Sequence, residues 1–148
     1  MFKHILIPTD GSELSGMAVS KGVVFAKSIG ARITILHVMP EFHQMPYYEG
    51  SAFIDGGLEQ KFKAEAQTRA DGYLAAAKKT ADAAGVACDG LAVTHDQAYR
   101  AIIETAQGRG CDLVLMASHG RRGLNGLLLG SETSKVLTHA KIPVLVYR

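Results

Sequence analysis

The sequence is poor in the features that mark several large classes of protein. It has no tryptophan, and its two cysteines, Cys88 and Cys111, are too few for the disulfide framework of a small secreted domain. Both cysteines fall at or beside predicted strands, so we expect reduced, buried thiols. The net charge of +2 is too small to favour nucleic acid or an anionic membrane as the partner.

Long apolar runs are missing as well. No run approaches the roughly 18 residues that a membrane-spanning helix needs. Met1 to His4 lead directly into a strand-like run, so we expect no cleaved signal peptide and a cytoplasmic location. The 148 residues suit one domain, and 47% hydrophobic with 20% charged residues is an ordinary composition for a globular chain. We therefore expect a single domain over residues 1–148.

What the sequence does contain is a regular alternation of short apolar runs and amphipathic segments. The apolar runs predict strands at 4–8, 33–38, 86–94, 113–116 and 143–147, and the amphipathic segments predict helices at 12–28, 58–84, 96–107 and 131–139. Near-continuous apolar strands that alternate with helices predict an α/β fold, a single open five-stranded parallel sheet with helices on both faces. We expect the strand order 3-2-1-4-5, with the 86–94 strand at an edge.

Hydrophobic spacing also predicts which helical faces are buried. In the first helix we expect the core-facing stripe to be Leu14, Met17, Ala18, Val24 and Phe25, with Gly30 as the stop. In the 58–84 helix the stripe begins at Leu58 and continues mainly through alanines, which predicts close packing on the sheet. Between the second strand and this helix, residues 39–57 hold aromatics, glycines and two prolines without a period. That connection is either a surface loop pinned by its aromatics or a lid over a ligand.

A glycine-punctuated stretch from Asp112 to Lys135 is the main candidate for a binding site. Its strand ends in a turn that reaches Gly120, and Gly130-Ser131 stands at a predicted helix start. Glycine lets backbone N–H groups approach an oxyanion, and a helix start presents unpaired N–H donors and a partial positive charge. Two such donor clusters on one connection predict a phosphate-binding site.

The end of the first strand is expected to face the same crevice. In open parallel sheets, ligands bind beyond the carboxyl ends of the strands, where the strand order reverses. If the first strand is central, Asp10 and the turn from Ala117 to Gly120 lie on either side of that crevice. Asp10 or Ser12 could instead serve only as the N-cap of the first helix.

Several segments together resemble one known family. They are Ile5 to Ser12, Leu36 to Val38, Met116 to Gly120, Leu128 to Ser131 and Ile142 to Val146. In order and spacing they resemble the universal stress protein family over essentially the whole chain. Its nucleotide-binding branch carries Gly, two residues, Gly, nine residues, then Gly-Ser or Gly-Thr, and this sequence matches it except that Ala117 replaces the first glycine.

The resemblance implies an adenine nucleotide as ligand, ATP with or without Mg²⁺, and a role for each matching position. Pro8, Thr9 and Asp10 would border the adenosine, with Asp10 near the ribose, and Val38 would meet the adenine. Met116, Ala117, His119 and Gly120 would wrap the ribose and the first phosphates, and Gly130, Ser131 and Thr133 would receive the terminal phosphates. Hydroxyl groups of Ser131 and Thr133 are expected to add donors, and the methyl group of Ala117 is expected to narrow the phosphate approach without closing it.

Some assignments stay open. His119 could be only a polar turn residue, or contact the ligand through its backbone, and Arg121 and Arg122 either clamp phosphate or are solvated. Five histidines lack a metal-ligand spacing such as His-x-x-x-His, so no structural zinc site is expected: His4, His37, His43, His95 and His139.

Three functions remain in competition. The first is a stress-response protein that binds ATP as a signal or structural state, the second a dimeric interaction protein with a vestigial site, and the third a slow ATPase. The sequence has no Gly-x-x-x-x-Gly-Lys-Ser/Thr loop and no lysine from Ala117 to Thr133, so efficient hydrolysis is not predicted. The apolar strand Val144 to Tyr147 predicts an open sheet edge and a two-fold dimer through it, which the resemblance also implies.

Overall fold

A computed structural model describes residues 1–43, 56–120 and 129–148. Most of the aromatic connection (44–55) and the segment 121–128 lie outside the described residues. The second segment contains Arg121 and Arg122, for which the sequence left open phosphate contact or solvation. The elements are β1 (His4–Pro8), α1 (Glu13–Ile29), β2 (Arg32–Met39), α2 (Gly56–Ala84), β3 (Cys88–Thr94), α3 (Ala98–Gly108), β4 (Leu113–Ala117), α4 (Ser131–His139) and β5 (Val144–Tyr147).

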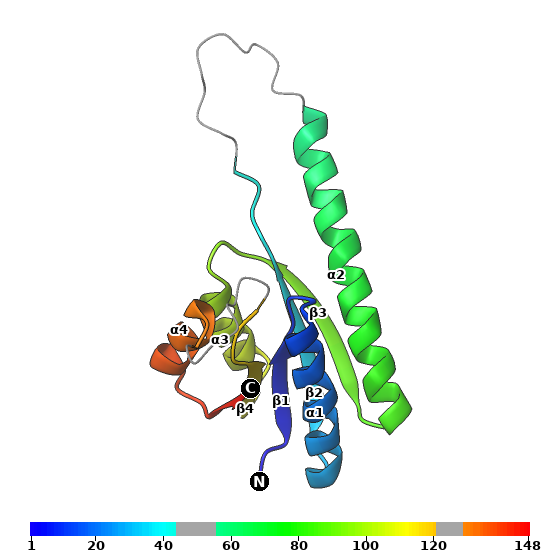
Figure 1. The fold of residues 1–148 in the computed structure, drawn as a ribbon, viewed down its shortest axis with the longest axis vertical. Helices are drawn as coiled ribbons and strands as arrows, with labels where there is room; N and C mark the ends of the chain where they lie inside the picture. The colour runs from blue at the N-terminus through cyan, green and yellow to red at the C-terminus, as the bar shows by residue number, and fades with distance from the viewer. Residues whose placement is uncertain (44–55, 121–128) are drawn as a thin grey trace.

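The five strands form one parallel sheet in the order β3-β2-β1-β4-β5, as the sequence predicts. β1 lies in the middle and pairs with β2 along its whole length and with β4 on its other side (Figure 1). The order of the strands reverses at β1, because the chain moves from β1 to one edge of the sheet and then crosses to β4. The crevice that such a reversal opens therefore lies between the carboxyl ends of β1 and β4.

Both faces of the sheet are covered, which explains the uninterrupted apolar runs Ile5–Ile7 of β1 and Leu113–Ala117 of β4. Ile5 and Ile7 of β1 face a core built with α1 and α2, whereas Leu6 faces a second core built with α3 and α4. All three side chains are fully buried. Successive side chains of a strand point to opposite faces, so a central strand between two helical layers needs a continuous apolar run.

Helix α1 begins and ends where the sequence signals predict, but its buried face differs from the expected stripe. The Ser12 side chain accepts a hydrogen bond from the N–H of Ser15, and Gly30 closes the helix in the left-handed region with φ 67°. Met17 and Val24 are 44% and 66% exposed, so their assignment to the core was wrong. The buried face is instead formed by smaller residues: Ser15, Ala18, Val19, Gly22, Val23 and Ala26.

Helix α2 packs through alanines, as predicted, with Ala66, Ala70, Ala77 and Ala81 buried. Leu58 is 59% exposed, because the first turns of this 29-residue helix run beyond the sheet (Figure 1), and its assignment to the stripe was wrong. Among the helices of the described residues, none has both the length and the apolar character needed to cross a membrane.

The amino ends of the central strands are tied together by polar groups. The carboxylate of Asp112, just before β4, accepts the backbone N–H groups of Lys3 at 2.8 Å and His4 at 3.0 Å. Nε2 of the buried His4 ring and Oγ1 of Thr34 on β2 share a 2.8 Å hydrogen bond. Burial, and next the nearby positive charge of Arg32, lower the pKa of His4 below its usual value. The ring is therefore neutral in the folded protein at neutral pH.

The two cysteines are free thiols, as predicted. Cys111 is buried and Cys88 is half-buried at the start of β3. Burial raises the pKa of Cys111 to about 11 and also raises the pKa of Cys88. Both groups are therefore uncharged near neutral pH and act as small packing residues.

Candidate functional site

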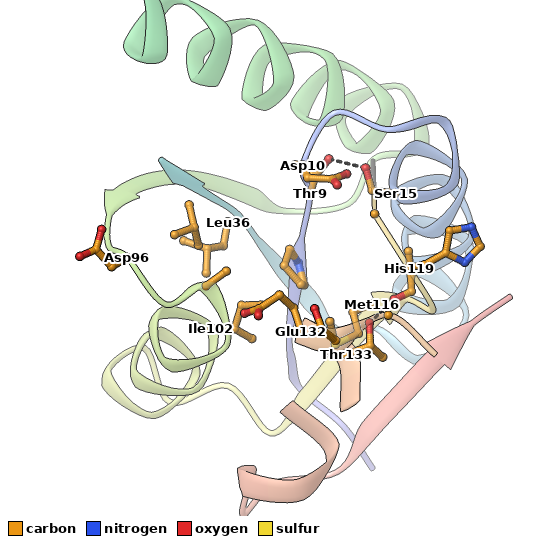
Figure 2. Close-up of a pocket in the computed structure, with 17 residues that line it drawn as sticks. Thr9, Asp10, Ser15, Leu36, Asp96, Ile102, Met116, His119, Glu132 and Thr133 are labelled. Atoms are coloured by element: carbon orange, nitrogen blue, oxygen red, sulfur yellow. Dashed lines mark hydrogen bonds between the residues drawn. The ribbon is translucent and has the colours of Figure 1, made fainter. Parts of the chain in front are cut away.

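A cavity of about 530 Å³ lies at the carboxyl ends of β1, β2 and β4, next to the starts of α3 and α4 (Figure 2). This volume is within the range of small-molecule sites. The eleven residues that the sequence singled out all line it: Pro8, Thr9, Asp10, Val38, Met116, Ala117, His119, Gly120, Gly130, Ser131 and Thr133. Their placement around one cavity is observed, and their contacts with a ligand remain predictions.

The turn after β1 forms one wall of the cavity. Thr9 and Ser15 share a 3.0 Å hydrogen bond between their hydroxyl groups, which ties the turn to the first turn of α1 (Figure 2). The Asp10 carboxylate accepts the backbone N–H of Ser12 at 3.0 Å through Oδ1. Since Ser12 supplies the side-chain cap of α1, Asp10 is not the N-cap that one interpretation of the sequence allowed.

This turn is held from behind by two aromatic rings. His37 of β2 donates from Nδ1 to the Thr9 carbonyl at 2.8 Å, and its ring meets the edge of Tyr73 of α2 at a centroid distance of 5.1 Å. Gly11 has φ 76°, and a Cβ there would collide with the Tyr73 ring. The turn therefore requires glycine both for its backbone conformation and for this close packing.

The turns after β1 and β4 meet, which was the geometric condition for a shared site. A Cβ atom built on Gly120 would collide with Oδ2 of Asp10. The backbone of Gly120 and the carboxylate of Asp10 are therefore in direct contact, and they lie at the junction of the two strand ends. The ends of the first and fourth strands face a common hollow, as predicted.

The start of α4 is fastened to the turn after β4. The N–H of Gly130 donates to the Ser118 carbonyl at 2.8 Å, and the Thr133 hydroxyl donates to the Ala117 carbonyl at 3.0 Å. Gly130 is the N-cap residue, and having no side chain it leaves the first N–H groups of α4 without a side-chain cap. The hydroxyl of Thr133 is committed to Ala117, so Thr133 offers a ligand its backbone N–H rather than the expected hydroxyl donor.

Ala117 replaces a glycine of the family pattern without obstructing the cavity. Its side chain belongs to the buried cluster on the α1 side of the sheet, together with Leu113 and Leu115 of the same strand. The residue is only 8% exposed. Because alternate residues of a strand face opposite sides, the methyl group points into the core, while the backbone of Ala117 borders the cavity. The expected narrowing of the phosphate approach therefore does not follow from this substitution.

Two acidic residues of the cavity wall were not predicted. Asp96 follows β3, and Glu132 lies in the first turn of α4. Oε2 of Glu132 accepts the backbone N–H of Tyr99 at 2.8 Å at the start of α3, and Oε1 pairs with Lys135 at 2.9 Å. Glu132 thus caps α3, whose own N-cap residue makes no side-chain cap bond.

One of these residues could have been found from the sequence. Asp96 lies just beyond the carboxyl end of β3, so the rule that selected Asp10 applies to it as well. Glu132 and Tyr99 lie 33 residues apart in sequence and on different helices, so no local sequence pattern predicts their contact. Leu36 and Ile102 belong to the core on the α3 and α4 side of the sheet and also line the cavity, which therefore exposes part of that core to a ligand.

The described part of the cavity wall is negatively charged. Of its described lining residues, three carry carboxylates, namely Asp10, Asp96 and Glu132, and none is lysine or arginine. The donors available to an anion in this part of the wall are therefore backbone N–H groups and hydroxyls. They include the backbone N–H groups of Gly120 and of the start of α4.

Comparison with known proteins relates the whole chain to one family. A family model described as "Universal stress protein family" matches residues 1–148. Universal stress protein MJ0531 of Methanocaldococcus jannaschii is 32% identical over 150 residues, which cover 100% of this chain and 83% of that protein. The solved structure of MJ0577 from the same organism has a TM-score of 0.81 at 28% identity, covering 99% of this chain and 95% of that chain.

Other solved structures with this fold contain adenine nucleotides. A universal stress protein in complex with cAMP is 22% identical with a TM-score of 0.71, covering 99% of this chain and 97% of that chain. Proteins of the family from Archaeoglobus fulgidus with dAMP and from Arabidopsis thaliana with AMP have TM-scores of 0.65 and 0.68 at 13% and 16% identity. At these identities the likeness establishes the fold alone. With the family model matched from the first residue to the last, the chain belongs to the universal stress protein family.

Proposed function

We propose that this protein binds an adenine nucleotide, with ATP as the leading candidate, in the cavity at the carboxyl ends of β1 and β4. The observation that carries the proposal is the contact between Asp10 and Gly120 beside the uncapped start of α4. A carboxylate and a cluster of backbone N–H groups thereby face one hollow. Related proteins with this fold hold cAMP, dAMP and AMP, which supports the same class of ligand here.

The wall offers a separate partner for each part of such a nucleotide. Leu36, Val38 and Ile102 provide an apolar surface against which a purine can pack. The Asp10 carboxylate can accept hydrogen bonds from ribose hydroxyls. The N–H groups at the start of α4 can donate to phosphate oxygens, where a helix N-terminus contributes roughly 0.3–1 kcal/mol to a nearby negative charge.

The proposed role is signalling or stress response through nucleotide occupancy, in the cytoplasm, rather than fast catalysis. The wall carries no lysine among its described residues, so a polyphosphate would be neutralised by backbone dipoles and an accompanying Mg²⁺. A slow ATPase is the alternative, and it requires phosphate release that falls in an Asp10→Ala variant. A vestigial site is less favoured, because the methyl group of Ala117 is packed in the core.

We also propose a two-fold dimer through β5. Within the described residues β5 pairs only with β4, and its other edge carries no partner strand. Leu145 is 41% exposed, so the strand presents apolar surface as well as the backbone N–H and C=O groups of its outer edge. An exposed, apolar edge strand is a template for pairing with another chain.

Calorimetric titration of the purified nucleotide-free protein tests the binding proposal. ATP with Mg²⁺, AMP and cAMP are added separately to protein at tens of micromolar, and saturable heat is expected for at least one of them. Mass spectrometry of the protein as purified, after denaturation, identifies any nucleotide that it retains. Absence of heat with all three ligands, together with no retained nucleotide, would overturn the proposal.

A further inference from the structure

Three metal-ligating side chains converge outside the set that the nucleotide proposal uses. Glu41 and His43 follow β2, and Asp96 follows β3. One ligand atom from each lies within 4.8 Å of the other two. The closest pair is His43 Nε2 and Asp96 Oδ1, at 2.7 Å. All three residues are exposed, so a hydrated ion can reach them without any movement of the fold.

The two segments that carry these side chains are fixed by other contacts. The N–H of His95 donates to the Met39 carbonyl at 3.0 Å and extends the β2–β3 ladder to the residue before Asp96. The Phe42 ring packs on Phe62 of α2 at a centroid distance of 5.4 Å. Phe42 stands between the two ligands of the β2 segment, so its anchoring to α2 restrains both of them. The convergence therefore follows from the sheet register and from α2.

From this geometry we propose that Glu41, His43 and Asp96 bind a divalent first-row transition-metal ion such as Zn²⁺. One imidazole nitrogen with two carboxylate oxygens suits such an ion, whereas Mg²⁺ and Ca²⁺ favour ligand sets made of oxygen alone. Donor atoms about 2.0–2.2 Å from a metal are roughly 3–4 Å apart, a spacing that these side chains reach by small rotations. Three protein ligands leave at least one position for water or another ligand.

The metal would take the place of the hydrogen bond between His43 and Asp96. Binding through Nε2 requires a neutral imidazole with its proton on Nδ1, so the proton that Nε2 now shares with Asp96 must leave that atom. That proton moves to Nδ1 if the ring is neutral, or to solvent if both nitrogens are protonated. Three coordination bonds to the ion then form, and water ligands of the hydrated ion are released. An exposed side-chain contact of this kind contributes little to stability by itself, so its replacement by a metal costs the fold little.

This site goes beyond the nucleotide proposal and does not depend on it. It does touch the same cavity, because Asp96 is one of the wall residues and lies on the opposite side from His119 (Figure 2). A bound cation would neutralise the negative charge of Asp96, one of the three carboxylates of the wall. Metal and an anionic ligand in the cavity therefore each raise the affinity for the other, since linkage between two sites is reciprocal.

The test uses the full chain without a histidine tag and without nucleotide. ZnCl₂ is titrated calorimetrically into the wild type, His43→Ala, Asp96→Asn and, as a matched control, His139→Ala, whose exposed ring lies on α4. We expect saturable binding of one ion in the wild type and the control, and a loss of affinity of about tenfold or more in the other two variants. Thermal unfolding in EDTA checks that all four proteins are folded.

Substitution by Co²⁺ identifies the ligands independently of affinity. Nitrogen and oxygen ligands give weak visible bands, whereas coordination by Cys88 or Cys111 adds an intense near-ultraviolet thiolate band. That thiolate band, or equal affinity in the wild type, His43→Ala and Asp96→Asn, would overturn the proposal. Failure of the wild type to bind Zn²⁺ saturably below millimolar concentration would also overturn it. Because no nucleotide is present, none of these outcomes bears on the proposed nucleotide site.

Discussion

Replacing Gly120 by alanine gives the sharpest test of where the nucleotide binds. The new Cβ would collide with Oδ2 of Asp10, so the carboxylate must rotate away or the turn must shift. Neither response needs a rearrangement of the core, because both residues lie on the cavity wall. The backbone of Gly120 does not require the left-handed region, which confines the effect of the substitution to this contact.

The size of the effect follows from the interactions that Asp10 makes. A hydrogen bond to a charged group contributes about 1.5–3 kcal/mol, which corresponds to a factor of about 10–150 in affinity. If the carboxylate accepts from the ribose, its displacement should weaken nucleotide binding by that factor. Loss of the bond from the Ser12 N–H to Asp10 would cost the fold about 1.5–3 kcal/mol.

The assay compares nucleotide affinity and thermal unfolding for the wild type, Gly120→Ala and Gly72→Ala. Gly72 lies inside α2, and a Cβ there meets nothing within 4 Å. The control should therefore keep its affinity and gain about 0.5–1 kcal/mol of stability from helix propensity. Unchanged affinity in Gly120→Ala would refute the placement of the ligand between the two strand ends. An affinity loss accompanied by a proportionate loss of the folded fraction would show a structural effect instead.

Three further outcomes follow from the structure. Gly22→Leu should lower the free energy of unfolding by about 1–3 kcal/mol in urea titrations, because a Cβ at Gly22 already collides with Cδ1 of buried Ile7. The pKa of His4 is lowered in the folded state, so the unfolded chain binds more protons as the pH falls below about 6.5; stability present above that pH should be lost on acidification, and less of it in a His4→Gln variant. Val146→Pro should give a monomer by light scattering while the fold persists, because the carbonyls of Pro143 and Tyr147 face β4 and alternation turns the N–H of Val146 to the open edge.

Each of these outcomes has a result that contradicts it. For Gly22, a leucine at Gly72 is the matched control on an open helical surface, and equal stability of the two leucine variants would show that the α1–β1 approach is not tight. For His4, parallel stability profiles of wild type and variant between pH 5 and pH 7 would show that its burial does not affect titration. For Val146, a dimer of unchanged mass would show that β5 is not the interface.

Much of the fold could be predicted from the sequence, because apolar residues recur with a different spacing in buried strands than in helices. The run Ile5–Ile7 is apolar at every position, which is compatible with a strand covered on both faces, and the structure buries all three side chains. The caps Ser12 and Gly30 act through neighbouring backbone groups, so they could be recognised locally. The exposure of Met17 and Val24 could not be predicted locally, because the face that a helix buries depends on the elements it packs against.

In the candidate site, too, some features could be predicted from the sequence and others could not. Asp10, Gly120 and Gly130 were predicted from local chemistry and from the rule for strand ends, and the structure brings them to one cavity. The commitment of the Thr133 hydroxyl to Ala117 could not be predicted, because it depends on how α4 docks on the turn after β4.

By itself, the sequence determined the kinds and order of the elements, the strand ends that carry polar residues, and the glycines where backbone approaches closely. These features depend on residues near one another along the chain. The tertiary structure alone decided which groups meet across long separations: Glu132 with the start of α3, and Glu41 and His43 with Asp96. Such contacts depend on strand register and helix docking, which the balance of packing over the whole domain sets rather than any local pattern.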